Sequence, residues 1–100
     1  MRRGSTPLHT FTLSIDTAEL LKIRITYHQL GRCVLTKTEK DATLDGYDVS
    51  VRLSEKETLA FRCSQDVDIQ IKVLTKSGDV IPSDPLRVDV ESCLDDEVMT

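Results

Sequence analysis

Tryptophan is absent from this chain, and aromatic residues of any kind are rare. Sugar-binding shelves, base-stacking platforms and the hot spots of protein interfaces depend largely on aromatic rings. The rings present are too few to form such a surface and also to fill a core; they are Phe11, Tyr27, Tyr47 and Phe61. The composition therefore disfavours carbohydrate binding.

Long apolar runs are also missing. No stretch approaches the roughly 20 apolar residues of a membrane-spanning helix. The opening residues Met-Arg-Arg-Gly-Ser-Thr-Pro are followed by alternating residues and not by the apolar run of a secretory signal. We therefore expect no signal peptide and no transmembrane segment, and folding in a reducing cytoplasm.

Positive charge is scarce relative to negative charge. The 13 Lys and Arg residues against 17 Asp and Glu residues give a net charge of −4. Nucleic-acid binding needs a basic face, and the basic cluster that stands out along the sequence is Arg2-Arg3, at an end that we expect to fray. The charge balance therefore predicts no nucleic-acid partner.

Alternating apolar and polar residues dominate what is present. This period of two predicts strands near residues 8–15, 21–27, 32–38, 49–53, 67–73 and 86–90. Shorter candidates at 42–44, 59–63 and 80–81 bring the expected number to about seven or eight. Helical turns are predicted after Asp16, an N-cap, and after Ser54, which opens a capping box closed by Glu57. Asp45-Gly46 predicts a type I′ hairpin turn.

The spacing of these elements predicts an all-β fold, an antiparallel sandwich or barrel of about seven to eight short strands with one or two single-turn helices. One hundred residues make one domain. We expect a flexible lead at 1–7, the sandwich at 8–92 and an acidic tail at 93–100. The predicted buried residues are Ile23, Ile25, Val49, Val51, Ile69, Ile71, Val88 and Val90, and Leu21 is placed on the same side as Ile23.

The edges of this sandwich carry features that oppose aggregation. Prolines keep a strand out of a sheet interior, and outward-facing cations discourage pairing between edges. These features are Pro82, Pro85, Lys22, Arg24, Lys72 and Arg87. Sheet edges on a domain without a catalytic site are natural docking surfaces, so the pattern favours an interaction or assembly module.

The two histidines offer no catalytic arrangement. His9 begins the first predicted strand and His28 ends the second, and we place both on the polar side of the alternation. A metal-ligand or general-base role requires partner groups of suitable geometry, which the sequence does not supply. Both are predicted to be surface histidines.

The cysteines are Cys33, Cys63 and Cys93, an odd number without a CxxC pair. In Ig domains a cysteine pair joins the two sheets against a tryptophan, which this chain lacks. We expect Cys33 and Cys63 to be buried free thiols that pack as small apolar residues. A cysteine nucleophile has no positive support.

Carboxylates gather near predicted turns and in the tail, at Asp45, Asp48, Asp66, Asp68, Asp95, Asp96 and Glu97. Clusters of this kind can bind Ca²⁺, but none has the EF-hand spacing, and turn chemistry with a solvated tail explains them better. We predict no catalytic, cofactor-binding or metal-binding residue, and no enzyme.

Several short sequence segments, spread over most of the chain, are similar to those of a known group of proteins. They are Thr6-Pro-x-His-x-Phe11, Ile23-Arg-Ile-Thr-Tyr27, Leu53-Ser-x-x-Glu-Thr-Leu59, Ile69-Gln-Ile-Lys-Val-Leu74 and Cys93-Leu-Asp-Asp-Glu-Val98. Together these segments resemble small proteins encoded in phages and prophages of Gram-positive gut bacteria. The middle and end of the chain are similar to the Ig-like N-terminal domain of phage baseplate upper proteins.

The resemblance implies an antiparallel Ig-like β-sandwich. It also implies a virion structural protein of the tail, baseplate or neck, docked in many copies on other virion proteins. The sequence ends at Thr100 without the receptor-binding or trimerising region of that family, so receptor binding is not implied. Two alternative functions remain: a cytoplasmic assembly adaptor, or a small Ig-like module that binds a glycan or Ca²⁺. A homo-oligomer is also compatible with the docking role.

Overall fold

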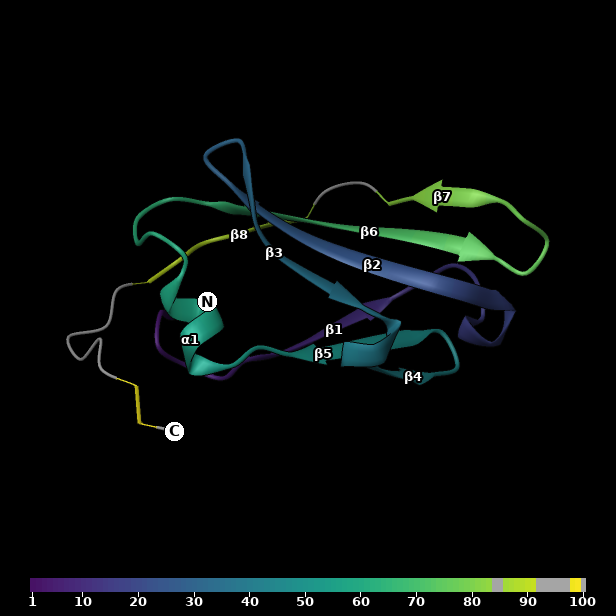
Figure 1. Ribbon diagram of the computed structural model, residues 1–100, viewed down its shortest axis with the longest axis horizontal. Helices are drawn as coiled ribbons and strands as arrows, with labels where there is room; N and C mark the ends of the chain where they lie inside the picture. Colours follow the sequence, from purple (N-terminus) through teal and green to yellow (C-terminus); the bar gives the residue numbers. More distant parts are fainter. Residues whose placement is uncertain (84–85, 92–97, 100) are drawn as a thin grey trace.

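Two antiparallel sheets face each other across one apolar core in the computed structural model, which describes residues 1–83, 86–91 and 98–99 (Figure 1). The first sheet has the order β1 (Leu8–Thr12), β5 (Asp48–Arg52), β4 (Ala42–Asp45). The second has the order β3 (Arg32–Thr38), β2 (Leu20–Gln29), β6 (Val67–Thr75), and then β7 (Val80–Pro82) and β8 (Leu86–Val88), which both pair with β6. The predicted all-β antiparallel sandwich is confirmed.

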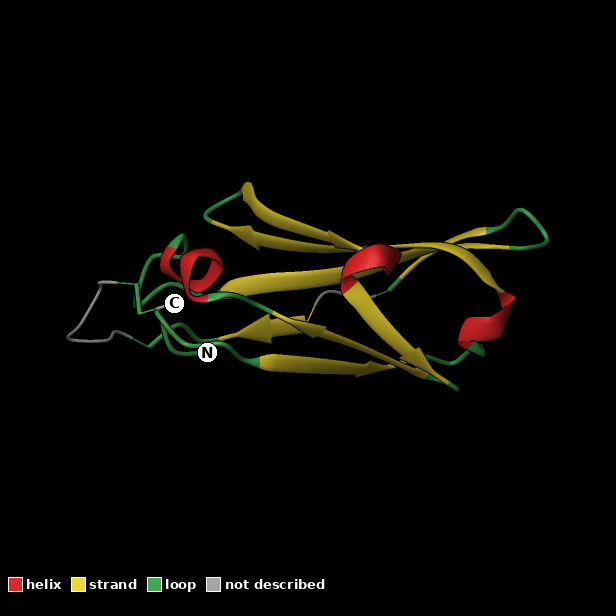
Figure 2. Cartoon of the chain, turned by 60° about the horizontal axis from the view of Figure 1, so that its bottom comes forward, coloured by secondary structure: helices red, strands yellow, loops and turns green. Residues whose placement is uncertain are grey.

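Each crossing between the sheets passes through a helical turn. These turns are η1 (Thr17–Glu19), η2 (Glu39–Asp41) and α1 (Glu55–Leu59). They lie at the ends of the strands (Figure 2). Asp16 caps η1 by accepting a hydrogen bond from the backbone N–H of Ala18, and the predicted capping box of Ser54 and Glu57 opens α1.

The strand order is that of an Ig-like sandwich without its first strand. Strands β1 to β6, followed by β7 with β8, correspond to B, C, C′, D, E, F and G, in sheets B–E–D and C′–C–F–G. In place of strand A, the N-terminal segment forms a parallel bridge between Arg2 and Glu91. Within the described residues, β1 pairs with β5 alone, so the other edge of β1 is uncovered.

The core is built from alternate residues of β2, β5 and β6. Ile23, Ile25 and Tyr27 of β2 lie opposite Val73, Ile71 and Ile69 of β6, and the first sheet contributes Val49, Val51 and Leu53. Of the eight residues predicted to be buried, seven are buried, and Val88 is half-buried at the edge strand β8. Lys22, Arg24, Lys72 and Arg87 face outward as predicted. The first three do not lie at a sheet edge as expected, because β2 and β6 are inner strands of the second sheet.

Leu21 does not lie on the core side as predicted, because the strand is irregular at its start. The pairing of β2 with β6 shifts between Leu20 and Lys22, as in a β-bulge. Leu21 is consequently 56% exposed, while Leu20 packs against the core. An extra residue in one strand reverses the direction of every side chain before it, so the alternation alone gave the wrong face.

Two further local predictions were wrong. Residues 59–63 form the end of α1 and a following turn, not a strand, although Phe61 is buried. The β4–β5 turn has positive φ at Gly46 (57°) but not at Tyr47, which fits type II′, not type I′. Positive φ at both central residues occurs instead at Leu30 and Gly31, between β2 and β3.

The N-terminal segment, residues 1–7, makes extensive contacts where the sequence led us to expect a flexible lead. The backbone N–H of Arg3 donates to Glu91 O, and the Arg3 guanidinium donates to Phe61 O (2.7 Å) and Leu59 O (3.0 Å) at the end of α1. A cation at a helix C-terminus complements the free carbonyls there. Most of the predicted acidic tail, and Pro85, lie outside the described residues.

Candidate functional site

The histidines and carboxylates considered as candidate catalytic or metal-binding residues lie in different parts of the structure. His28 is exposed as predicted, whereas His9 is half-buried. The carboxylates at residues 45, 48, 66 and 68 lie on turns and strands, and residues 93 and 95–97 are outside the described ranges. Among the described residues, no three His, Cys, Asp or Glu side chains are close enough to hold a metal ion.

Cys33 and Cys63 are free but exposed, which corrects the prediction that they are buried. Cys33 takes an outward position on β3, where its Sγ lies 3.3 Å from Thr36 Oγ1, and Cys63 lies in the turn after α1. The disulfide of an Ig domain joins strands B and F, here β1 and β6, and neither cysteine lies on those strands.

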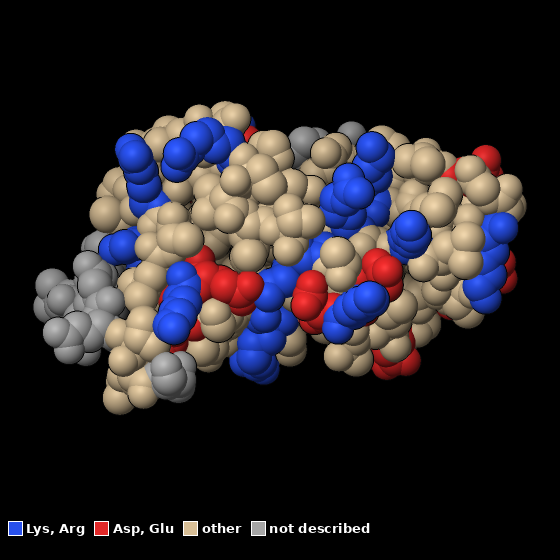
Figure 3. Space-filling view, in the orientation of Figure 1, with Lys and Arg blue, Asp and Glu red and all other residues tan. Residues whose placement is uncertain are grey.

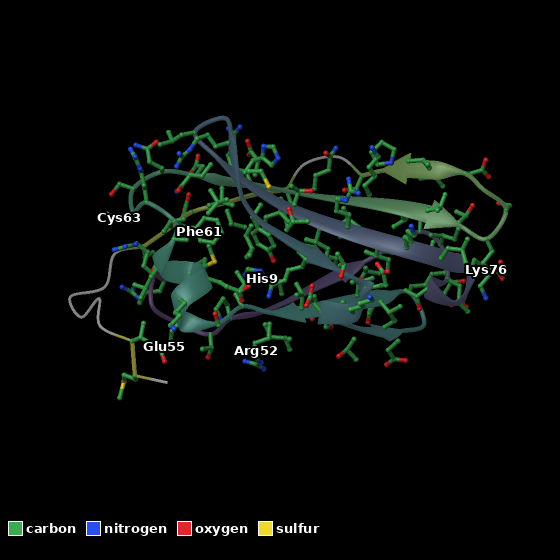
Figure 4. The ribbon with its side chains drawn as sticks, in the orientation of Figure 1. His9, Arg52, Glu55, Phe61, Cys63 and Lys76 are labelled. Atoms are coloured by element: carbon green, nitrogen blue, oxygen red, sulfur yellow. The ribbon has the colours of Figure 1, made fainter. Side chains whose placement is uncertain are left out.

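His9 faces the core and not the polar side of β1. It lies opposite the buried Val51, in the same alternation as Phe11. Its Nδ1 is 2.7 Å from the hydroxyl of Tyr27, and the two rings stack with centroids 5.7 Å apart. Tyr27 also contacts Phe61, at 6.0 Å between centroids, and Figure 4 places His9 and Phe61 between the layers, near α1.

Burial keeps this pair neutral. It lowers the pKa of His9, with a further contribution from the N-terminal ammonium, and it raises the pKa of Tyr27, assisted by the charge of Glu57. Tyr27 lies on the strand that carries the tryptophan of an Ig domain, and His9 on one of the strands that carry its disulfide. The rings therefore join the two sheets, and Tyr27 is fully buried.

The lowered pKa of His9 predicts a loss of stability in mild acid. Between the unfolded-state pKa of about 6.5 and the lower folded value, the unfolded chain binds more protons, so the free energy of unfolding falls as pH falls. His9→Gln keeps a hydrogen-bond partner for Tyr27 but does not titrate. Chemical denaturation at pH 7.5 and 5.5 should show a larger drop for the wild type than for this variant, and equal drops would contradict the assignment.

An ion pair ties β3 to α1 beside these rings. Lys37 Nζ lies 2.5 Å from Glu57 Oε2, and Glu57 Oε1 accepts the backbone N–H of Ser54 at 2.8 Å. Burial opposes ionisation of Glu57, but the hydrogen bonds from Lys37 and Ser54 outweigh it and lower the pKa of this carboxyl. The Glu57 carboxylate therefore takes part in both the N-terminal cap of α1 and the ion pair with Lys37.

A groove of about 550 Å³ lies across β2, β6, β7 and η2, on a face that sequence reasoning did not single out. We call it the basic groove. Its cationic residues are Lys22, Arg24, Lys40 and Lys72, and its apolar lining includes Leu74 and Val80. In Figure 3, Lys and Arg side chains are spread over both halves of this face, and some of them lie over β2 and β6 with acidic atoms nearby.

One carboxylate, that of Glu39, also lines the basic groove. Glu39 Oε2 accepts the backbone N–H of Ile23 at 3.1 Å. That hydrogen bond and one from its own backbone lower the pKa of Glu39, and Lys22 and Lys40 lower it further. Four cations and one ionised carboxylate leave the groove with three positive charges.

A second hollow, of about 300 Å³, opens between the sheets beside the uncovered edge of β1. We call it the β1 cleft. Its apolar lining comes from both sheets and consists of Phe11, Leu13, Ile69, Ile71 and Leu86, together with Thr10, Thr12 and Ser83. A free strand edge with an apolar cleft along it has the features needed for strand addition.

No protein-family model matches this chain, and no curated protein or solved structure shows significant similarity to it. Within the described part of the chain, no helix has the length and apolar character needed to cross a membrane.

Proposed function

We propose that this chain is a non-enzymatic structural or assembly protein of a phage virion, a component of the tail, baseplate or neck that acts as a docking module. The resemblance of its strand and turn phrases to the Ig-like domain of baseplate upper proteins supplies the virion context. The observation that carries the docking role is the uncovered edge of β1 with the apolar β1 cleft beside it.

Strand addition at β1 supplies both affinity and specificity. An incoming strand would pair with the free backbone groups of residues 8–12, as strand A does in a complete Ig sheet. Its alternate side chains would enter the β1 cleft and contact Phe11 and Leu86, which are half-buried and exposed in the isolated chain. The partner would thereby complete the core.

The opposite sheet also ends in an edge suited to contact. Strand β7 has three residues, of which Val80 is 56% exposed and Ile81 is 47% exposed. Pro82 ends it and limits further pairing, because proline has no backbone N–H to donate. A short edge with apolar side chains favours packing against a specific partner over open-ended sheet extension.

Quantitative mass spectrometry of purified phage particles tests the proposal. We expect this chain at a fixed stoichiometry relative to known structural proteins in the particle. A chain found in the infected cells but absent from purified particles would contradict virion membership and would indicate the alternative role of cytoplasmic assembly adaptor.

A further inference from the structure

We propose that the basic groove binds a short acidic segment of a partner protein, an extended peptide that carries carboxylate and apolar side chains on the same face. This inference rests on the proposed function, because it names the chemistry of one partner in the particle. It concerns a different face from the β1 cleft, since the groove lies on the outer side of the second sheet.

The first support is a pair of like charges held face to face. Arg24 of β2 lies directly opposite Lys72 of β6, and both side chains are exposed on the same face. Like charges at paired positions destabilise a sheet. Neither side chain has an ion pair or a side-chain hydrogen bond within the described residues. An arrangement that costs stability while leaving two cations available is expected where an anionic partner completes it.

The second support is the charge contrast with the rest of the chain. The groove carries three positive charges, and the chain as a whole carries −4, so the remainder carries −7. A long phosphate polymer that entered the groove would meet this acidic remainder and be repelled. A short carboxylate-rich segment would contact the groove alone, which favours a peptide over a nucleic acid.

The third support is the apolar lining between the cations. Leu74 lies opposite Val80 in the pairing of β6 with β7, one residue pair beyond the row of Ile23 and Val73. Val80 is 56% exposed and borders the groove. A carboxylate alone would leave this apolar surface in water, whereas a leucine two residues away, on the same face of an extended peptide, would cover it.

Fluorescence anisotropy with a labelled synthetic peptide, Asp-Leu-Glu-Glu-Leu-Asp, tests this proposal. We compare R24Q/K72Q with the control R32Q/K56Q, which removes the same charge from exposed positions outside the groove. We expect the groove variant to raise Kd by about tenfold or more and the control by about twofold or less. A peptide with lysines in place of its acidic residues should not bind the wild type.

Three results would overturn the proposal: no binding of the acidic peptide to the wild type, equal weakening by both double variants, or equally tight binding of a short single-stranded DNA. Lys72→Glu is the control for misfolding, because it places a carboxylate opposite Arg24 and so removes the repulsion between the two cations. This variant should lose peptide binding while its melting temperature stays the same or rises. A fall in melting temperature would argue against the repulsion that supports the site.

The two proposals fail separately. If the peptide did not bind, the abundance of the chain in purified particles would still test the virion role. Absence of the chain from particles would contradict the virion role, while the peptide titration would still report whether the groove binds carboxylates.

Discussion

Tyr27→Ala is expected to lower the free energy of unfolding by about 3–5 kcal/mol, the usual cost of deleting a large aromatic side chain from a core. Tyr27 is fully buried, stacks on His9 and contacts Phe61, so it joins both sheets to the segment after α1. Domains of this size have about 5–15 kcal/mol of stability in total. Urea denaturation should therefore show a midpoint shift that removes a large share of it.

Tyr47→Ala is the matched control for this substitution. Tyr47 lies in the β4–β5 turn and is 54% exposed, so the same deletion there should change the free energy of unfolding by less than about 0.5 kcal/mol. Similar losses at the two positions would contradict the placement of Tyr27 at the centre of the core.

Thr58→Val is the second substitution with a large expected effect, about 1–3 kcal/mol of destabilisation. Thr58 is fully buried in α1; its Oγ1 donates to Ser5 O at 2.9 Å and accepts the backbone N–H of Gly4 at 3.0 Å. Valine keeps the shape but leaves both backbone groups without this partner. We also expect faster hydrogen exchange at the Gly4 amide, measured by NMR.

Thr43→Val is the control for the threonine-to-valine substitution itself, because Thr43 is exposed on β4. It should leave both the stability and the Gly4 exchange rate close to the wild type. If Thr58→Val also left the Gly4 amide protected, then Thr58 would not be the group that holds the N-terminal segment against α1.

Fold class was predictable because the alternation in this sequence is strong and local. Residues 23–27, 49–53 and 67–73 place an apolar side chain at every second position, and each of these stretches is a core strand. The capping box at Ser54 was equally local, since its two hydrogen bonds join residues three apart.

The errors arose where a side chain's surroundings depend on distant parts of the chain. The bulge that exposes Leu21 follows from pairing with β6, about fifty residues away. His9 was placed on the polar side because of its residue type, although its position relative to Phe11 already indicated the inner face. Cys33 and Cys63 were expected inside from average behaviour, whereas their local positions are an outward strand site and a turn.

The basic groove could not have been found from sequence proximity. Its cations come from β2, η2 and β6 and are brought together only by strand pairing and by the crossing at η2. Along the chain the same residues read as isolated solvent-facing positions of three separate elements. The like-charge pair of Arg24 and Lys72 exists only in the register of β2 with β6.

Carbodiimide cross-linking of purified phage particles, followed by mass spectrometry, tests the central claim most directly, because it couples lysine amines to carboxylates in direct contact. The account predicts that this chain is present in the particle, and that Lys22, Lys40 or Lys72 is coupled to an aspartate or glutamate of a second virion protein. A particle without this chain would contradict the account, and so would a chain whose groove lysines form no link to another protein.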